Sequence, residues 1–336
     1  MLDFLTRTPR RRQSAANGAA QVLLIADRPF WAYDSIAKSL IKYADDPHIS
    51  FDIEYMKGGT RSIRDIHKDY DLLFFLGWQS LGEMIGGRIK ARHSFLNRRR
   101  VITGIHSHHS WDNQQTLPDH SVPPPTELID FLAQFAGVNT VSNKLYTLFL
   151  GAGLRNLGCT LNGVDTEIFT GRSPVSNDGP LRVGFSGNLK HDWRKGVTEF
   201  IEPGCDMPGV EVRLAMNQDD SYVPLEQMPS FYADLDAYLC ASSSEGFSLS
   251  VLEAAASGIP VVSTRVGGCE DLIIDGINGF LVDRNVDAIR DKIAFLRDNR
   301  DAAIEMGSRN RDIVTQMWSW AVRAKTWHAF IKAHLN

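Results

Sequence analysis

Long apolar runs are missing from this chain of 336 residues. The longest uninterrupted ones, such as 22–26 and 72–76, fall far short of the about 20 residues that a membrane-spanning helix needs. At the N-terminus, Leu2, Phe4 and Leu5 come before the arginines, which reverses the order found in a secretory signal. We therefore expect neither a membrane span nor a cleaved leader.

Cysteine is scarce, and none of the four cysteines forms a CxxC pair. This pattern predicts reduced thiols in a cytoplasmic protein and disfavours a disulfide scaffold or a zinc site. A basic excess is missing too, because 36 Lys and Arg residues stand against 40 Asp and Glu residues, a net charge of -4. Such a balance disfavours a dedicated nucleic-acid binder. An apolar fraction of 43% excludes a wholly disordered or fibrous chain.

Residues 1–20 differ in charge from the rest of the chain. They hold four arginines and one aspartate, a net charge of +3, which leaves -7 for the other residues. Their content of Ser, Ala, Asn and Gly predicts a disordered basic tail. The alternative is peripheral contact of this tail with anionic lipid headgroups at the inner face of a membrane.

From residue 21 onward, short apolar runs alternate with segments of helical spacing, which indicates parallel sheets covered on both faces. A Gly-, Pro- and Ser-rich segment near residue 175 separates two such series. We predict an α/β fold with two Rossmann-like domains, at 21–170 and 171–317, and a C-terminal helix at 318–336. Strands are expected at 22–26, 49–55, 72–76, 100–105, 137–141, 181–185, 210–215, 235–240, 260–263 and 279–282.

The most informative strand-to-helix turn follows the strand that ends near residue 240. Ligands bind at the carboxyl ends of the strands in open α/β sheets, and Glu245 and Gly246 stand in this turn. Gly246 permits close backbone approach, and residues 247–250 would open a helix whose free N–H groups suit an anion. Together with Glu253 further along that helix, Glu245 would hold a polyhydroxylated group. The alternative is a helix-capping Glu and an exposed Glu.

The turn after the strand at 181–185 combines glycine with several cations. It contains Gly187, Asn188, Lys190, Arg194 and Lys195. Opposite the Glu245 loop, such a turn would clamp a pyrophosphate. The alternative is a solvated basic loop.

Three histidines follow the strand at 100–105. In an extended chain, His106 and His108 point one way and His109 the other, which disfavours a metal site. We favour a single His106 that faces the cleft between the domains and contacts a ligand. A structural histidine is the alternative.

The first strand-to-helix turn is rich in aromatic residues. Arg28, Phe30, Trp31 and Tyr33 form a candidate ledge for an acceptor, because aromatic faces suit sugar rings. The alternative is that Phe30 and Trp31 pack under the helices of the first domain.

With these motifs in place, the second half of the chain resembles the retaining nucleotide-sugar glycosyltransferases of family 4. Coverage is strong from about residue 138 to residue 330. The matching segments occur in the family's order: 141–144, 162–169, 187–196, 245–254, 258–262, 267–270, 275–282 and Trp320.

The resemblance implies a GT-B fold, in which two Rossmann-like domains face each other across a cleft and the last helix crosses back to the first domain. It also implies a nucleotide-diphospho-sugar donor of the UDP or GDP type, with no bound metal or other cofactor. Glu253 matches the Glu that holds the ribose, and Glu245 the Glu beside the transferred sugar. His106 matches the first-domain His near that sugar, and Lys195 the Lys of the diphosphate clamp.

The phosphates would be held by backbone N–H groups that open the helix after Glu245 and Gly246. In this sequence they belong to Phe247, Ser248 and Leu249. The chain departs from the family's pattern at Asn188, where an Arg is usual, so Lys190 or Arg194 would have to replace that cation.

The predicted function is transfer of a sugar from the donor to an acceptor hydroxyl, with retention at the anomeric carbon and a front-side mechanism. The expected acceptor is a glycan, a protein-linked sugar or a lipid-linked sugar. One alternative is a degenerate GT-B module that binds a sugar or a partner protein. Another is a GT-B nucleotide-sugar epimerase.

Overall fold

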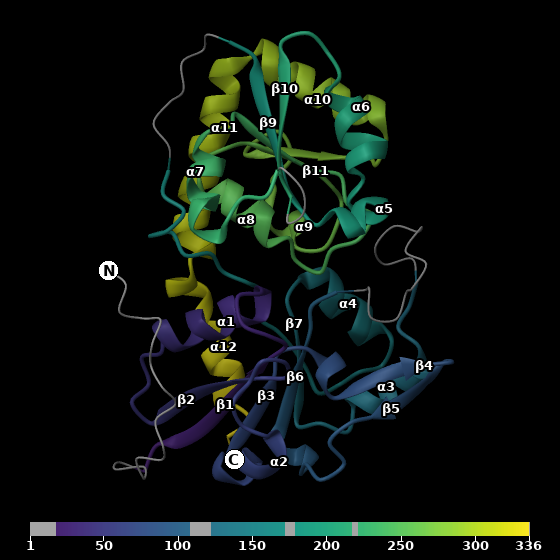
Figure 1. The fold of residues 1–336 in the computed structure, drawn as a ribbon, viewed down its shortest axis with the longest axis vertical. Helices are drawn as coiled ribbons and strands as arrows, with labels where there is room; N and C mark the ends of the chain where they lie inside the picture. The colour runs from purple at the N-terminus through teal and green to yellow at the C-terminus, as the bar shows by residue number, and fades with distance from the viewer. Residues whose placement is uncertain (1–17, 108–121, 172–178, 217–220, 336) are drawn as a thin grey trace.

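The computed structural model describes residues 18–107, 122–171, 179–216 and 221–335. Two lobes lie one above the other in Figure 1, and each is built around a parallel sheet. The elements of the first lobe are β1 (Ala20–Ala26), α1 (Ala32–Lys42), β2 (Ile49–Tyr55), α2 (Ile63–Ile66), β3 (Leu72–Phe75), β4 (Gly82–Ile85), β5 (Arg88–Ala91), β6 (Val101–Ile105), α3 (Thr126–Leu132), β7 (Gly137–Thr140), α4 (Asn143–Gly151) and β8 (Leu157–Cys159).

The first lobe contains a parallel sheet of order β2-β1-β3-β6-β7-β8. Its strands form where the sequence predicts them. β3 and β6 are buried on both faces, whereas β2, at the edge of the sheet, is only partly buried. Two features were missed. The short strand β8 extends the sheet, and a separate hairpin joins β4 to β5 through Gly86 and Gly87, which both have positive φ. The hairpin is largely exposed, so it lacks the apolar run that marks the other strands.

The second lobe contains a parallel sheet of order β10-β9-β11-β12-β13, again at the strands that the sequence predicts. A fully buried segment, β11, occupies its centre. The elements of this lobe are β9 (Leu181–Gly187), α5 (Asp192–Lys195), α6 (Glu202–Cys205), β10 (Val210–Met216), α7 (Met228–Ala233), β11 (Ala237–Cys240), α8 (Leu249–Ala256), β12 (Val261–Thr264), α9 (Cys269–Leu272), β13 (Gly279–Val282), α10 (Val286–Asp298) and α11 (Arg300–Ile313).

The last helix, α12 (Trp320–Lys332), runs back into the first lobe, as expected (Figure 1). It packs against α1, where the His328 ring contacts the carbonyl oxygen of Leu40 at 3.0 Å. The helix begins at Trp320 and not at residue 318, which corrects the predicted start. The physical reason is a backbone bridge between Ser319 and Val164, which holds Ser319 extended and breaks the helix.

The two lobes also meet at the ends of their strands. α4 follows β7 in the first lobe, and α9 follows β12 in the second. The side chain of Asp271 in α9 accepts from the backbone N–H of Asn143 at 3.0 Å and from its Nδ2 at 2.9 Å. Lys144 forms an ion pair with Glu270 beside it. These contacts bring the carboxyl ends of both sheets to one interface, so ligand-binding turns of both lobes face each other there.

Within the described ranges, no helix is long and apolar enough to cross a membrane. The predicted tail at 1–20 lies outside the described residues except for its last three positions.

Candidate functional site

Glu245 lies buried between two cations at the carboxyl ends of the neighbouring strands β9 and β11. Lys195, at the end of α5, forms an ion pair with its Oε1 atom, and Arg194 Nη1 lies 3.2 Å from the same oxygen. Ser242 Oγ donates to that oxygen as well, at 2.7 Å. The structure thus brings together Glu245 and two of the cations that the sequence placed in a separate turn.

Burial alone would raise the pKa of Glu245. The charges of Lys195 and Arg194, and the hydrogen bonds from Lys195 and Ser242, outweigh burial and lower it to about 2. Glu245 is therefore ionised at neutral pH. A carboxylate held in this way is available to stabilise positive charge without accepting a proton.

Residues of the glycine-and-cation turn either shape the turn itself or lie beside Glu245. Gly187 ends β9, and Asn188 Oδ1 accepts from the backbone N–H of Lys190 at 2.9 Å, so Asn188 closes the turn. The side chain of Lys190 is exposed. Arg194 instead is mostly buried, and its Nη1 donates to the carbonyl oxygen of Ser244 at 2.6 Å. Of the two cations considered as substitutes for the Arg that is missing at 188, Arg194 is thus the one beside Glu245.

One donor of Arg194 has no partner. Its Nε atom is buried and makes no hydrogen bond with any residue that the structure describes. Buried donors are normally satisfied, so this N–H is a candidate contact for a ligand oxygen.

The helix after Glu245 and Gly246 opens within the segment 247–250, as the sequence predicts. α8 starts at Leu249 with Ser248 as its N-cap, and the Ser248 side chain makes no capping hydrogen bond. Its hydroxyl lies 3.0 Å from that of Ser250 instead. The first backbone N–H groups of α8 are therefore not capped by a side chain, which suits an anion. Phe247 precedes the helix, and its ring packs against that of Trp318, with 5.5 Å between the ring centroids.

Gly246 lies against the backbone of His106 from the other lobe. A Cβ atom at position 246 would stand 1.7 Å from the carbonyl oxygen of His106, so no side chain fits there. The glycine thus permits the close approach that the sequence predicts, and the partner is the protein's own backbone. This contact places His106 beside the Glu245 turn.

The His106 ring packs edge-on against Tyr33, with 4.7 Å between the ring centroids, and lies 6.2 Å from Trp327 of α12. Burial lowers the pKa of His106 to about 3, so the ring is neutral at neutral pH. Its Nε2 atom is buried and unpartnered among the described residues. His108 and His109 lie outside those residues. No group of three or more His, Cys, Asp or Glu residues that could hold a metal ion occurs in the described ranges.

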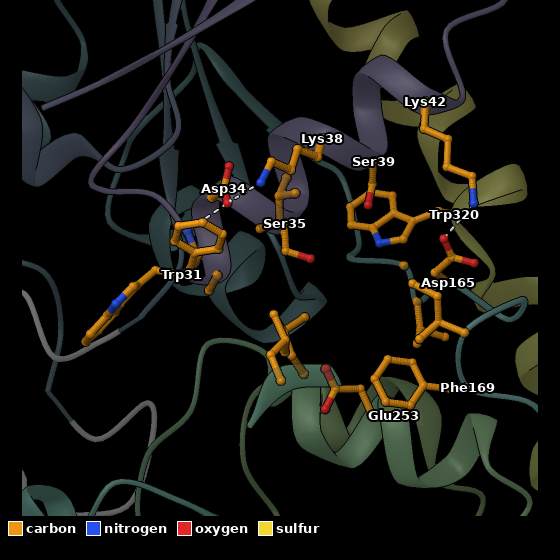
Figure 2. A pocket seen from close by; sticks show the side chains of 18 of the residues that line it. Trp31, Asp34, Ser35, Lys38, Ser39, Lys42, Asp165, Phe169, Glu253 and Trp320 are labelled. Atoms are coloured by element: carbon orange, nitrogen blue, oxygen red, sulfur yellow. Dashed lines mark hydrogen bonds and ion pairs between the residues drawn. The ribbon is translucent and has the colours of Figure 1, made fainter. Parts of the chain in front are cut away.

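Glu253 faces a different part of the interface from Glu245. It lines a cavity of about 590 Å³ between the two lobes, which Glu245, Lys195 and His106 do not line. Figure 2 shows Glu253 and Phe169 on one wall, with residues of α1 and α12 across from them. Burial raises the pKa of Glu253 to about 7, although the hydroxyl of Tyr232 donates to Glu253 Oε2 at 2.8 Å.

The aromatic first turn is split between two environments. Phe30 and Trp31 are 70% and 47% exposed and line the cavity, so the alternative that they pack under the helices is wrong. Arg28 stacks on the Trp31 ring at 3.7 Å. Tyr33 turns away from them toward His106. Phe30 has a φ of 63°, in the left-handed region, and its N–H donates to Asp34 at 2.8 Å.

Three residues of this region were missed as site residues by sequence reasoning. Ser242 and Tyr232 contact Glu245 and Glu253, but Ser and Tyr in loops and short helices carry no motif of their own. Arg284 donates from Nε to the carbonyl oxygen of Ala241 at 2.9 Å and so braces the strand end before the Glu245 turn. It comes from the loop after β13, far away in the sequence, and no local signal marks it.

Residues 221–312 match the family model described as glycosyl transferases group 1. A segment of 118 residues is 32% identical to the GDP-mannose-dependent alpha-(1-6)-phosphatidylinositol monomannoside mannosyltransferase of Mycobacterium tuberculosis, covering 33% of this chain and 31% of the relative. A segment of 151 residues is 38% identical to the D-inositol 3-phosphate glycosyltransferase of Corynebacterium kroppenstedtii, covering 44% of this chain and 32% of the relative. The matches thus span about a third of these relatives.

Solved structures resemble most of the chain. Sucrose-phosphate synthase from Thermosynechococcus elongatus superposes with a TM-score of 0.71 at 15% identity, over 94% of this chain and 98% of that one. Anabaena HepE in complex with UDP-glucose gives a TM-score of 0.69 at 18% identity, over 93% of this chain and 99% of HepE. The chain therefore has the GT-B fold, and its residues 221–312 match a glycosyltransferase family model.

Proposed function

We propose that this protein transfers a sugar from a nucleotide-diphospho-sugar to an acceptor hydroxyl, with retention at the anomeric carbon. The observation that carries the proposal is the cluster of Glu245, Lys195 and Arg194 just before the uncapped start of α8. An ionised carboxylate beside two cations and a helix N-terminus suits a reaction in which a diphosphate leaves a sugar ring. The matched family model, which includes Glu245, supports this reading.

In the proposed step, the bond from the anomeric carbon to the leaving phosphate oxygen breaks. The acceptor oxygen forms its bond to that carbon on the same face, and its proton passes to the departing diphosphate. Lys195, Arg194 and the first N–H groups of α8 stabilise the charge on the diphosphate. Glu245 orients the sugar and stabilises positive charge at the ring, and it forms no covalent bond.

This arrangement needs no bound metal, because two side-chain cations and a helix N-terminus meet the diphosphate charge. We assign the ribose hydroxyls to Glu253 and the phosphates to the amides at the start of α8. UDP and GDP are the proposed nucleotide types, since relatives of this chain are named for GDP-mannose and HepE was solved with UDP-glucose.

The acceptor is proposed to be a glycan or a lipid-linked sugar that enters over the first turn. That turn runs from the cavity rim, at Trp31, to Tyr33 beside the neutral His106 ring. Arg28 and Trp31 form a stacked surface on which a sugar ring can lie.

A thermal-shift panel of UDP-, GDP-, ADP- and dTDP-sugars, followed by product analysis, tests the proposal. We expect one donor to stabilise the protein and to release its nucleoside diphosphate, with retained anomeric configuration in the product. Stabilisation without turnover in any acceptor mixture would favour a binding module. Conversion of the donor without an acceptor into an isomeric nucleotide sugar would favour an epimerase.

A further inference from the structure

The guanidinium of Arg284 lies between the two turns of the proposed reaction centre, the cation turn after β9 and the Glu245 turn after β11. Arg284 itself is half-buried and belongs to the loop that follows β13. We propose that it is a positioning residue for sugar transfer, because it fixes the main chain of Arg194 against the Glu245 turn. The inference rests on the proposed function, and it concerns a residue outside both turns.

Arg284 contacts main-chain carbonyl oxygens of both turns. Its Nε donates to the carbonyl oxygen of Ala241, just after β11, at 2.9 Å. Its Nη2 lies 3.4 Å from the carbonyl oxygen of Arg194 and 3.5 Å from that of Trp193. The planar fork of a guanidinium presents several donors in a fixed geometry, which a single ammonium group cannot do. One side chain therefore connects the end of the strand to the cation turn.

Both the main chain and the side chain of Arg194 belong to this junction. Its carbonyl oxygen accepts from the backbone N–H of Ser243 at 2.9 Å, in addition to the contact from Arg284. Its side chain returns to the same turn, where Nη1 donates to the carbonyl oxygen of Ser244 at 2.6 Å and lies 3.2 Å from Glu245 Oε1. A shift of the Arg194 main chain would therefore move its charge away from Glu245.

The residues after Lys195 leave room for the Arg284 side chain. Gly196 ends α5 with a φ of 70°, in the left-handed region. A Cβ atom at position 196 would stand 3.0 Å from Arg284 Nη2 and 3.1 Å from the carbonyl oxygen of Ala241. The guanidinium also stacks on the Phe200 ring, with 4.2 Å from its central carbon to the ring centroid. The glycine and the aromatic ring thus help to fix the orientation of the guanidinium.

Release of nucleoside diphosphate from the donor that wild type cleaves tests this role. Arg284→Met removes the bridge and should lower kcat/KM by about 10- to 100-fold, since a misplacement of about 1 Å can cost 100-fold. Arg284→Lys keeps the charge without the fork, so its kcat/KM should stay within about 3-fold of that of the Met variant. Wild-type turnover by Arg284→Met would overturn the inference. Full rescue by lysine would overturn it too, because the charge alone would then suffice.

Arg290→Met is the matched control. Arg290, on α10, also donates to a main-chain carbonyl oxygen of the second lobe, from Nη2 to Pro203 of α6 at 2.6 Å. Its loss should change kcat/KM by less than about 3-fold, as for substitutions away from a site. A loss as large as that of Arg284→Met would show a general cost of removing such contacts and would overturn the inference.

A double-mutant cycle shows whether Arg284 acts through Arg194. If it does, Arg284→Met should slow the Arg194→Met protein by less than about 3-fold further, although it slows wild type by about 10- to 100-fold. Equal losses in the two backgrounds would overturn the inference, because Arg284 would then act independently of Arg194.

A measurement without any donor separates this inference from the proposed function. Burial would raise the pKa of Glu245, but Lys195 and Arg194 lower it to about 2. In Arg284→Met this pKa should move back toward 4.5, so the stability that wild type gains over Glu245→Gln should shrink and be lost at a higher pH. Urea unfolding between pH 2 and pH 7 measures this change, which Arg290→Met should not cause.

The two outcomes of that measurement bear on different claims. An unshifted pH profile in Arg284→Met overturns the inference, and donor cleavage by wild type would still leave the proposed function standing. A shifted profile in a protein that cleaves no donor would overturn the proposed function and leave Arg284 as the residue that positions Arg194. Arg284→Lys, measured in parallel, keeps the test valid if the Met variant lowers the unfolding temperature.

Discussion

Gly246 and His106 touch across the two lobes so closely that a methyl group on the glycine would stand 1.7 Å from the histidine carbonyl oxygen. The Glu245 turn of one lobe and the end of β6 in the other therefore fit only with glycine at this position. This contact links the arrangement of the lobes to the geometry of the proposed reaction centre.

Gly246→Ala should consequently separate the lobes without unfolding either one. We expect turnover to fall by at least 100-fold and stability to drop by about 1–3 kcal/mol, the usual cost of overpacking. Donor turnover and thermal unfolding measure the two effects. Gly151→Ala is the control, since nothing lies within 4 Å of a Cβ there. A Gly246→Ala protein with normal turnover would show that the contact is not needed.

The ion cluster around Glu245 should leave a signature in stability at low pH. Its pKa is lowered from 4.5 to about 2, so its stabilising contribution is complete above about pH 4.5 and is lost as the pH falls through 2. The shift corresponds to about 3 kcal/mol. Urea unfolding of wild type and Glu245→Gln between pH 2 and pH 7 should show wild type losing this advantage over the variant on acidification. If the unfolding free energies of wild type and Glu245→Gln changed with pH in parallel, the ion pairing assigned to Glu245 would be contradicted.

Glu253 should make nucleotide binding depend on pH near neutrality. Its pKa is raised to about 7 by burial, and ribose hydroxyls that donate to it favour the ionised form. The dissociation constant for the nucleotide should therefore fall as pH rises from 6 to 8, and Glu253→Gln should remove this dependence. The folded protein itself should become less stable over pH 4.5 to 7, because the carboxyl group ionises more readily in the unfolded chain. An unchanged pH profile in the variant would argue for another group.

Arg194 and Lys190 offer a direct comparison of two cations in one turn. Arg194 Nη1 lies 3.2 Å from Glu245 Oε1, whereas the Lys190 side chain is exposed. Arg194→Met should lower kcat/KM by about 100- to 1000-fold, since it removes a charge from the leaving diphosphate. Lys190→Met, the matched control, should change it by less than about 3-fold, in keeping with an exposed charge. If Lys190→Met lowered kcat/KM more than Arg194→Met did, Lys190 and not Arg194 would be the cation that contacts the diphosphate.

The sequence was a good guide to the fold and a partial guide to the site. Buried parallel strands such as β3 and β11 are continuous apolar runs, so they could be placed from the residues alone. The β4–β5 hairpin could not, because it is exposed and has no such run. The start of α12 at Trp320 depends on the bridge between Ser319 and Val164, a tertiary contact that no local pattern encodes.

For the site, motif spacing placed Glu245 and Lys195 in turns that the fold brings together, because both turns follow neighbouring parallel strands. The choice between Lys190 and Arg194 depends on the folded structure, since the two residues belong to one turn and only Arg194 is mostly buried beside Glu245. The cavity that Glu253 lines joins residues of α1 and α12, far apart in the sequence, and it exists only once α12 has crossed back over α1.

The Glu245 cluster is the proposed centre of sugar transfer. Release of nucleoside diphosphate from a panel of UDP-, GDP-, ADP- and dTDP-sugars, by wild type, Glu245→Gln and Lys195→Met, tests it directly. We predict that wild type cleaves one donor and that both variants are at least 100-fold slower, while their circular dichroism spectra stay native. Release at the wild-type rate by both folded variants, or no release from any donor by wild type, would contradict the account.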